Sequence, residues 1–358
     1  MNICIIGQYP PQVGGIATYT SNVKDELERL GHNVYVLTYP SDIQREKNVF
    51  EANTANVPLL RGFSFIFSSY RLLLELIDKH DIELIHANYI LPPALVAVLT
   101  KRKKDIKIVT SVHGSDINIL AKNVLLKPII RYTLDKSDEV YFVSNNLYEK
   151  ALELNVDNLG NKSTIIPNTV NTDKFKPNAT DDNPLKDKYG KPLVIFIGNL
   201  VKQKGLEYLL RAKHESKTDY ALLIYGDGQE YDNLKNMIDE YNLKDTYLMG
   251  KTHSPEKIIP QADIMVLPSV SEGASIIALE SMSCQRAFIS TDTGNINDVI
   301  THDENGIIVP AKDSKKLSEE IDRLISDERL REKLGINARE SIMKNYSKIK
   351  IPYIEKEQ

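Results

Sequence analysis

Two glutamates flank a run of small residues in the stretch PSVSEGASIIALESMSC, residues 268–284. Glu272 stands just before the small residues, and Glu280 lies about two helical turns further along, within an apolar run. Backbone N–H groups at the start of such a helix are unpaired and lie at its positive end, so they can bind a pyrophosphate. These donors would come from Gly273, Ala274, Ser275 and Ile276.

The two carboxylates flanking these donors could accept hydrogen bonds from hydroxyl groups. Glu280 has enough lone pairs to accept from both hydroxyls of a ribose, and Glu272 could accept from a bound sugar. The alternative is that each glutamate caps a helix or pairs with a neighbouring cation, as charged side chains commonly do.

A second candidate group lies in VTSVHGSDIN, residues 109–118, where a strand ends in His113-Gly114-Ser115-Asp116. In an α/β domain, polar side chains at the carboxyl end of a strand point toward the ligand crevice. His113 could therefore bind a sugar hydroxyl or stabilise charge, and Asp116 could orient the loop. The alternative for His113 is a structural role, with the neutral ring satisfied by a backbone group.

A third group lies in FIGNLVKQKG, residues 196–205, where a strand ends and a helix follows. Lys204, or less favourably Lys202, could place a positive charge on a diphosphate, although a solvated lysine is the alternative. The loop GQYPPQVGG at residues 7–15 does not fit the pattern GxGxxG, so a dinucleotide fingerprint is not supported. The GDG at residues 226–228 is common turn chemistry.

Short β-branched runs alternate with longer helical patterns along the whole chain, which predicts βαβ units around parallel sheets. Apolar residues from Ile16 to Leu30 recur at helical spacing and predict a helix that begins at Gly14-Gly15 and stops at Gly31. The predicted strands lie in residues 2–7, 32–39, 82–88, 106–114, 138–144 and 163–170, and then in 192–200, 220–228, 246–250, 263–269, 287–293 and 306–310.

The chain of 358 residues is longer than one hydrophobic core usually supports, so we expect two domains. The polar, proline-broken residues 171–190 read as a connection between them. We therefore predict α/β domains at 1–170 and 191–344, and a helical tail at 345–358. Ligands of such domains bind in the cleft at the carboxyl ends of the strands.

The amino-acid composition of the chain limits the classes of partner that we expect. With 45 basic and 49 acidic side chains, the net charge of −4 argues against binding to nucleic acid. The longest uncharged apolar run, residues 90–99, is too short to span a bilayer, so we expect a cytosolic protein without a membrane span. Cys4 and Cys284 have no metal-ligand spacing and are expected to be buried thiols.

Taken together, the motifs resemble those of retaining glycosyltransferases of family 4, which have the GT-B fold. The similarity runs over nearly the whole chain and in the family's order: the Gly14-Gly15 loop, HGSD at 113–116, PNTV at 167–170, GNLVKQKG at 198–205, GDG at 226–228, and Glu272 to Glu280 as the E-x7-E motif. The resemblance implies two Rossmann-like domains facing across a cleft. The C-terminal domain would bind a nucleotide sugar, the N-terminal domain would receive the acceptor, and the helix at 345–358 would cross back to the first domain.

The resemblance also implies roles for single residues. Lys204 and the amides of 273–276 would hold the diphosphate, Glu280 the ribose and Glu272 the transferred sugar. His113 would lie beside the sugar and the Gly14-Gly15 turn beside the phosphates. His113, Glu272 and Lys204 are thus the expected catalytic residues, and Asp116 and Asn168 are candidate contacts of the sugar or acceptor.

Three positions depart from the family pattern. Asn199 stands in the donor-binding loop where the family often has arginine, EGFG becomes EGAS with the added Ser275 hydroxyl, and PNG becomes Pro167-Asn168-Thr169. Because Asn199 cannot supply a second cation, Lys204 is left nearly alone on the phosphates.

The expected reaction moves a sugar from a UDP-sugar or GDP-sugar to a glycan or lipid-linked acceptor in cell-surface polysaccharide or glycoconjugate synthesis. No metal or other cofactor is expected. The arginine and phenylalanines of residues 61–77 and the basic cluster 101–104 could contact an anionic membrane at its inner face, although a core helix and a solvated cluster are the alternatives. Two other functions stay open: a non-catalytic nucleotide-sugar-binding subunit and a nucleotide-sugar epimerase of the same fold.

Overall fold

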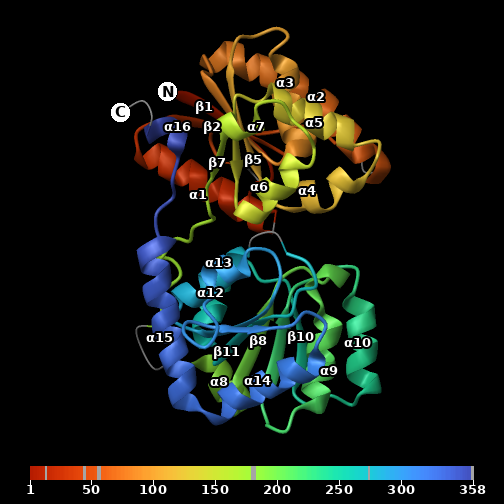
Figure 1. Ribbon diagram of the computed structural model, residues 1–358, viewed down its shortest axis with the longest axis vertical. Helices are drawn as coiled ribbons and strands as arrows, with labels where there is room; N and C mark the ends of the chain where they lie inside the picture. Colours follow the sequence, from red (N-terminus) through yellow and green to blue (C-terminus); the bar gives the residue numbers. More distant parts are fainter. Residues whose placement is uncertain (13, 43–45, 55–57, 179–182, 273–274, 356–358) are drawn as a thin grey trace. The chain divides into compact units, whose positions relative to one another are not determined.

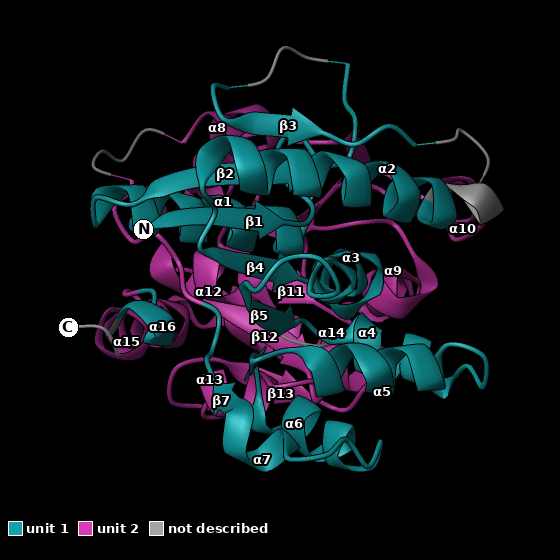
Figure 2. Cartoon of the chain, turned by 90° about the horizontal axis from the view of Figure 1, so that it is seen from above, with its two compact units in different colours: residues 1–168, 349–358 teal, residues 169–348 magenta. Residues whose placement is uncertain are grey.

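The computed structural model describes residues 1–12, 14–42, 46–54, 58–178, 183–272 and 275–355 (Figure 1). The chain divides into two compact units (Figure 2). Unit 1 comprises Met1–Asn168 together with Ile349–Gln358, and unit 2 comprises Thr169–Lys348. Each unit is built around its own parallel β-sheet, as the alternating pattern predicts.

The sheet of unit 1 has the strand order β3-β2-β1-β4-β5-β6-β7. Six of its strands were predicted; β3 was not, because three residues at the sheet edge are too few to give a periodic signal. Residues 163–170 were predicted as one strand, but β7 ends before Pro167, whose ring nitrogen cannot donate to a ladder. The strands are β1 (Asn2–Ile6), β2 (Asn33–Thr38), β3 (Val49–Glu51), β4 (Leu84–Asn88), β5 (Lys107–Val112), β6 (Glu139–Phe142) and β7 (Ser163–Ile165).

The first helix of unit 1 confirms its predicted extent. It spans Gly15–Arg29 as α1, buries Tyr19, Val23 and Leu27, and is followed by Gly31 with a φ of +86°. The other helical segments are α2 (Pro58–His80), η1 (Ile90–Ala94), α3 (Leu95–Thr100), α4 (Ser115–Asn118), η2 (Leu120–Lys122), α5 (Lys127–Lys136), α6 (Asn145–Leu152), α7 (Leu159–Lys162) and α16 (Pro352–Glu355).

The sheet of unit 2 has the order β10-β9-β8-β11-β12-β13, and all six of its strands were predicted. All five residues of β9 and of β12 are buried, as expected for parallel strands covered on both faces. The strands are β8 (Leu193–Ile197), β9 (Ala221–Tyr225), β10 (Thr246–Gly250), β11 (Ile264–Leu267), β12 (Ala287–Thr291) and β13 (Ile307–Val309).

Helices of unit 2 pack beside this sheet, with α9 in contact with α10 and α14, and α15 in contact with α12 and α14. They are α8 (Pro184–Tyr189), η3 (Lys202–Lys204), α9 (Leu206–Glu215), α10 (Tyr231–Glu240), α11 (Pro255–Ile258), η4 (Ile259–Gln261), α12 (Ile276–Ser283), α13 (Ile296–Val299), α14 (Ser314–Ser326) and α15 (Glu328–Asn345).

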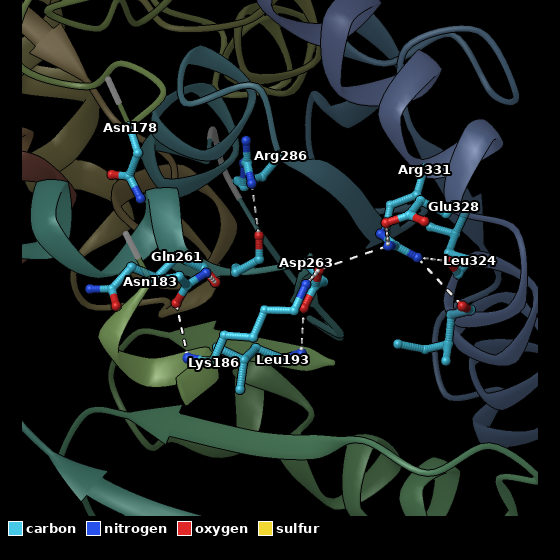
Figure 3. A network of polar contacts seen from close by, with 12 residues as sticks. Asn178, Asn183, Lys186, Leu193, Gln261, Asp263, Arg286, Leu324, Glu328 and Arg331 are labelled. Carbon is cyan, nitrogen blue, oxygen red and sulfur yellow. Dashed lines mark hydrogen bonds and ion pairs between the residues drawn. The ribbon is translucent and has the colours of Figure 1, made fainter. Parts of the chain in front are cut away.

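The stretch predicted as a connection belongs to unit 2 where it is described. The Asn183 amide donates to the carbonyl of Gln261 at 2.9 Å, and the Lys186 ammonium lies 3.6 Å from Asp263 (Figure 3). Asp263 also accepts from the N–H of Leu193 at 2.8 Å, at the start of β8. Phe175 is buried in the hydrophobic core of unit 2. Polar residues of this stretch therefore form specific hydrogen bonds and an ion pair with the rest of unit 2.

The end of the chain leaves unit 2 after α15 and joins unit 1. The carbonyl of Tyr346 accepts from the N–H of Val170 at 3.0 Å, within unit 2. Tyr353 of α16 is fully buried in unit 1, where its hydroxyl lies 3.0 Å from Nδ1 of His86. Among the described helices, none is long and apolar enough to cross a membrane.

Candidate active site

In each sheet, the direction of chain winding reverses at one point, which is where ligands of open parallel sheets bind. This switch lies between β1 and β4 in unit 1 and between β8 and β11 in unit 2. The loops that follow these strands hold the Gly14-Gly15 turn in unit 1 and both Lys204 and Glu272 in unit 2.

Glycines bring three loops of unit 2 into close contact. A Cβ atom on Gly226, in the loop after β9, would lie only 1.9 Å from the carbonyl oxygen of Gly198. A Cβ atom on Gly205 would lie 2.1 Å from the carbonyl oxygen of Pro268, and Gly205 has a φ of +62°. Only glycine fits these positions, so the GDG turn and Gly205 align the loop after β8 with those after β9 and β11.

Lys204 and Glu272 form an ion pair at this switch point. The hydroxyl of Ser269 donates to the same Oε2 atom of Glu272 at 3.2 Å, and the N–H of Val270 donates to the carbonyl of Gln203 at 2.8 Å. An ammonium group has three donors, and the contact with Glu272 uses one of them. Lys204 thus keeps donors for an anion while the carboxylate fixes its position.

The helix that carries Glu280, α12, begins at Ile276, one residue after two residues that the structure does not describe. Gly273 and Ala274, two of the four predicted amide donors, lie outside the described residues. Ser275 is the N-cap of α12, and its Oγ accepts from the N–H of Ala278 at 3.3 Å. The Ser275 hydroxyl therefore caps the helix, and the N–H of Ile276 lies in the first turn, where backbone donors have no partner within the helix.

Glu280 is buried, with only 6% of its surface exposed. Burial raises the pKa of its carboxyl group to about 8; the charge of Lys174 lowers the pKa, and that of Glu256 raises it further. Among the described residues, none forms a hydrogen bond with the Glu280 carboxyl group. A buried carboxyl without donors is costly, and hydroxyl groups of a ligand would relieve that cost.

Two charged neighbours of Glu280 were not anticipated from the sequence. Lys174 lies in the predicted connection and Glu256 in the first turn of α11, and the Lys174 ammonium is 3.7 Å from Oε2 of Glu256. They are separated from Glu280 by 106 and 24 positions in the numbering. No local pattern links such distant residues.

His113 directly follows β5 in unit 1, whereas the predicted strand, 106–114, included it. Its ring packs edge-on against Tyr19 of α1 with 4.7 Å between centroids, and its Nε2 is buried without a hydrogen-bond partner. Burial lowers the pKa of His113 to about 4, so the imidazole is neutral at physiological pH. A neutral ring with a free nitrogen can exchange a hydrogen bond with a hydroxyl group.

Asp116 holds the loop that presents His113. Its carboxylate accepts from the N–H groups of His113 at 3.2 Å, Gly114 at 2.8 Å and Ile117 at 3.2 Å. Burial raises the pKa of Asp116 to about 6, and these three bonds oppose the rise. These three hydrogen bonds hold the backbone of the loop in place.

The remaining predicted residues differ in their surroundings. A Cβ atom on Gly14 would meet nothing within 4 Å, so the turn into α1 is open, and Gly15 is the first residue of α1. Asn168 is buried, and its Oδ1 has no hydrogen-bond partner. Asn199 has an exposed side chain in the loop after β8.

The structure thus brings together Lys204 and Glu272 in unit 2, and His113 and Asp116 in unit 1. In the described parts of the chain, no group of three or more histidine, cysteine, aspartate or glutamate side chains could hold a metal ion.

Known glycosyltransferases resemble this chain over most of its length. Residues 178–341 match the family described as glycosyl transferases group 1, and residues 13–174 match glycosyltransferase family 4. An uncharacterised glycosyltransferase of Methanocaldococcus jannaschii is 30% identical over 343 residues, covering 95% of this chain and 93% of the relative. The N-acetyl-alpha-D-glucosaminyl L-malate synthase of Bacillus anthracis is 28% identical over 355 residues, covering 95% and 92%.

The fold is shared with solved structures. Sucrose-phosphate synthase from Thermosynechococcus elongatus superposes with a TM-score of 0.84 at 21% identity, over 96% of this chain and 94% of that one. Two Rossmann-like units of this kind define the GT-B class of glycosyltransferases. The chain belongs to glycosyltransferase family 4.

Proposed function

We propose that this glycosyltransferase is a retaining enzyme that transfers a sugar from a UDP-sugar or GDP-sugar to a glycan or lipid-linked acceptor. It would act in the cytoplasm, in the synthesis of cell-surface polysaccharide or another glycoconjugate. No metal or other cofactor is part of the proposal. The observation that carries it is the Lys204–Glu272 pair at the switch point of unit 2.

The contacts of unit 2 support a donor site for a nucleotide sugar. Lys204 has donors left for a diphosphate, and the first turn of α12 adds backbone N–H groups. Glu280, buried and without donors, suits the two hydroxyls of a ribose. In this reading Glu272 both orients Lys204 and accepts from a hydroxyl of the transferred sugar.

The proposed chemistry is a front-face transfer in which the leaving phosphate takes the acceptor's proton. The enzyme then has to orient both substrates and stabilise the leaving phosphate, which suits one lysine and several N–H donors. His113, neutral and with a free ring nitrogen, would bind a sugar hydroxyl without adding a charge.

Related proteins support the choice of substrates. An Anabaena protein, HepE, has been solved with UDP-glucose and superposes with a TM-score of 0.81 at 16% identity. Two relatives have names that mention malate or a lipid. They are the N-acetyl-alpha-D-glucosaminyl L-malate synthase of Bacillus anthracis, and a GDP-mannose-dependent alpha-(1-6)-phosphatidylinositol monomannoside mannosyltransferase of Mycolicibacterium smegmatis, 23% identical over 370 residues. The UDP-glucose in the HepE structure and the GDP-mannose in the name of the mannosyltransferase support a nucleotide-sugar donor for this chain.

We also propose contact between α2 and an anionic membrane. Phe63 and Phe67 are 74% and 63% exposed, and the guanidinium of Arg71 lies 4.5 Å from the ring centre of Phe67. In the basic cluster 101–104, Lys101 and Lys104 are paired with Asp138 and Asp78. The exposed rings of α2 therefore support the proposal more than the cluster does.

Substitutions at the ion pair test the proposed function. Lys204→Ala and Glu272→Gln should each lower the rate of sugar transfer at least about tenfold, or ~1.4 kcal/mol of barrier, because the leaving phosphate loses its cation or the cation loses its position. Lys202→Ala removes an exposed lysine of the same loop and should have little effect. The measurement is nucleotide release together with analysis of the sugar product.

The donor for this assay comes from a thermal-shift screen with UDP, GDP, ADP and their sugars. A ligand at 100 times its dissociation constant stabilises the protein by about 2.7 kcal/mol. Unchanged transfer in both variants would refute the assigned roles. A free epimer formed without an acceptor would indicate an epimerase, and nucleotide binding without turnover would indicate a non-catalytic subunit.

A further inference from the structure

Unit 1 contains a cavity of about 910 Å³ to which the proposed function assigns no role. Its lining comes from residues 117–155, and includes α4, η2, the first half of α5, the end of α6 and the three residues after α6. Because α4 packs against α6 and η2 packs against α5, these segments form one continuous wall. We call this space the 117–155 cavity.

The lining of the 117–155 cavity is strongly positive. Glu153 is the acidic side chain of the lining, against four cationic side chains: Lys122, Lys127, Arg131 and Lys150. The whole chain has a net charge of −4, so a local excess of three positive charges departs from the balance of the chain as a whole. Such an excess costs free energy through self-repulsion unless an anion occupies the site.

Few of these cations are neutralised by the protein. Within the described residues, Lys122 and Lys127 form no ion pair, and Arg131 lies 3.9 Å from the carboxylate of Asp157, at the outer limit of one. The Lys150 ammonium donates to the amide oxygen of Asn118 at 3.0 Å, a neutral partner. An exposed cation binds an anion weakly by itself, so a site depends on the four cations that line the same cavity.

Apolar side chains accompany the charges. Ile117, Ala121 and Leu154 line the cavity and are themselves buried, and Val124 at the lining is 83% exposed. A bare inorganic ion gains nothing from such surface, whereas a carbon skeleton that carries an anionic group does.

The cavity shares a short backbone segment with the proposed site. Residues 113–118 hold His113 at one end and the lining residues Ile117 and Asn118 at the other. The Asp116 carboxylate accepts from the N–H groups of both His113 and Ile117, so one buried group fixes both ends.

We propose that the 117–155 cavity binds the acceptor by a carboxylate or phosphate group on its carbon skeleton. The inference rests on the proposed function, because it assigns the acceptor of that reaction to a chemical class. Lys127 and Arg131 bind the anion, with Lys122 and Lys150 beside them, and the apolar lining receives the skeleton.

Calorimetric titration of the whole protein tests the proposal without any sugar donor. The probes are L-malate, inorganic phosphate and, as a neutral skeleton, glycerol. We expect saturable binding of an anion and none of glycerol. The double variant Lys127→Gln, Arg131→Gln should raise the dissociation constant at least tenfold.

The matched control is Lys235→Gln with Lys244→Gln, two exposed lysines of unit 2, which should leave the affinity unchanged. Tighter binding of malate supports a carboxylate acceptor, and tighter binding of phosphate supports a phosphorylated one. The proposal is overturned if neither anion binds, or if both double variants weaken binding equally, or if the cavity variant leaves it unchanged.

Nucleotide release from the donor, measured in parallel, separates this proposal from the proposed function. Transfer that proceeds while cavity substitutions leave anion binding unchanged overturns the cavity alone. Anion binding that depends on Lys127 and Arg131, in a protein that turns over no nucleotide sugar, overturns the function and leaves the cavity as an anion site.

Discussion

Glu280 illustrates how a single buried residue can favour function over stability. Its carboxyl group has no hydrogen-bond donor among the described residues, and burial raises its pKa to about 8. The unfolded chain loses this proton near pH 4.5, while the folded chain holds it to about pH 8. The contribution of this carboxyl group to the free energy of unfolding is therefore fully present below about pH 4.5. It decreases as the pH rises and is lost by about pH 8.

Replacing Glu280 by glutamine should thus stabilise the protein at high pH. Glu280→Gln cannot ionise, so we expect it to raise the free energy of unfolding by about 1 kcal/mol or more at pH 8.5 and to change it little at pH 4. The same variant should bind the donor nucleotide more weakly, because glutamine offers fewer acceptor sites to a ribose. Denaturant unfolding at both pH values and a nucleotide titration measure these effects.

The exposed Glu319 on α14 provides a control for this test. Glu319→Gln should change stability by no more than about 0.5 kcal/mol at either pH, as surface substitutions usually do. A Glu280→Gln variant that is less stable than the wild type at pH 8.5 would contradict a destabilising effect of the buried, ionised carboxylate.

Close backbone contacts determine how three loops of unit 2 lie against one another. Gly205 and Gly226 allow the loop after β8 to touch the loops after β11 and β9, at distances where any side chain would clash with a carbonyl oxygen. This contact gives Lys204 its partner Glu272.

The element with exposed aromatic rings is α2 of unit 1, and substitutions on this helix test its proposed contact with the membrane.

If α2 binds the membrane, removing its exposed rings should release the protein from anionic vesicles. Burying one phenylalanine side chain stabilises by about 2 kcal/mol, so Phe63→Ser with Phe67→Ser should lower the bound fraction at least about tenfold in co-sedimentation. Ile336→Ser with Met343→Ser removes two exposed apolar side chains of α15 and should have no such effect. Wild-type protein that ignores anionic vesicles would remove the membrane proposal.

The whole molecule consists of two units that the chain connects twice, at 168–169 and at 348–349. The last segment belongs to unit 1 because Tyr353 is fully buried there, with its hydroxyl bound to His86. Burial lowers the pKa of His86 to about 3, so the ring stays neutral and depends on its two partners, Tyr353 and Ser111.

Removing one hydroxyl on each side of the boundary should therefore weaken different units. Tyr353→Phe leaves Nδ1 of His86 unpaired and should cost about 1–2 kcal/mol in unit 1. Tyr346→Phe removes a hydrogen bond of 2.7 Å to the carbonyl of Asp298 and should cost a similar amount in unit 2. Hydrogen exchange resolved by strand would report the losses in β4 and β5 for the first variant and in β11 and β12 for the second. Equal losses in both units for either variant would contradict this division.

Much of the fold, and the positions of the candidate residues along the chain, could be predicted from local sequence pattern. Twelve strand regions and α1 were readable because alternation and helical spacing are local properties, and β3 was missed because it is too short to have a pattern. Lys204, His113 and Glu272 were placed at strand ends because glycine and polar residues follow apolar runs there. The ordered set of motifs identified the family.

Only the tertiary structure decided which of these residues meet and what surrounds them. The pairing of Lys204 with Glu272, the burial of Glu280 near Lys174 and Glu256, and the free nitrogen of His113 against Tyr19 all join segments far apart in the chain. Burial and the resulting pKa depend on every atom packed nearby, whichever part of the chain supplies it. Sequence spacing fixes a residue's place along its own strand or helix, but the loops and helices that close over it come from elsewhere in the fold.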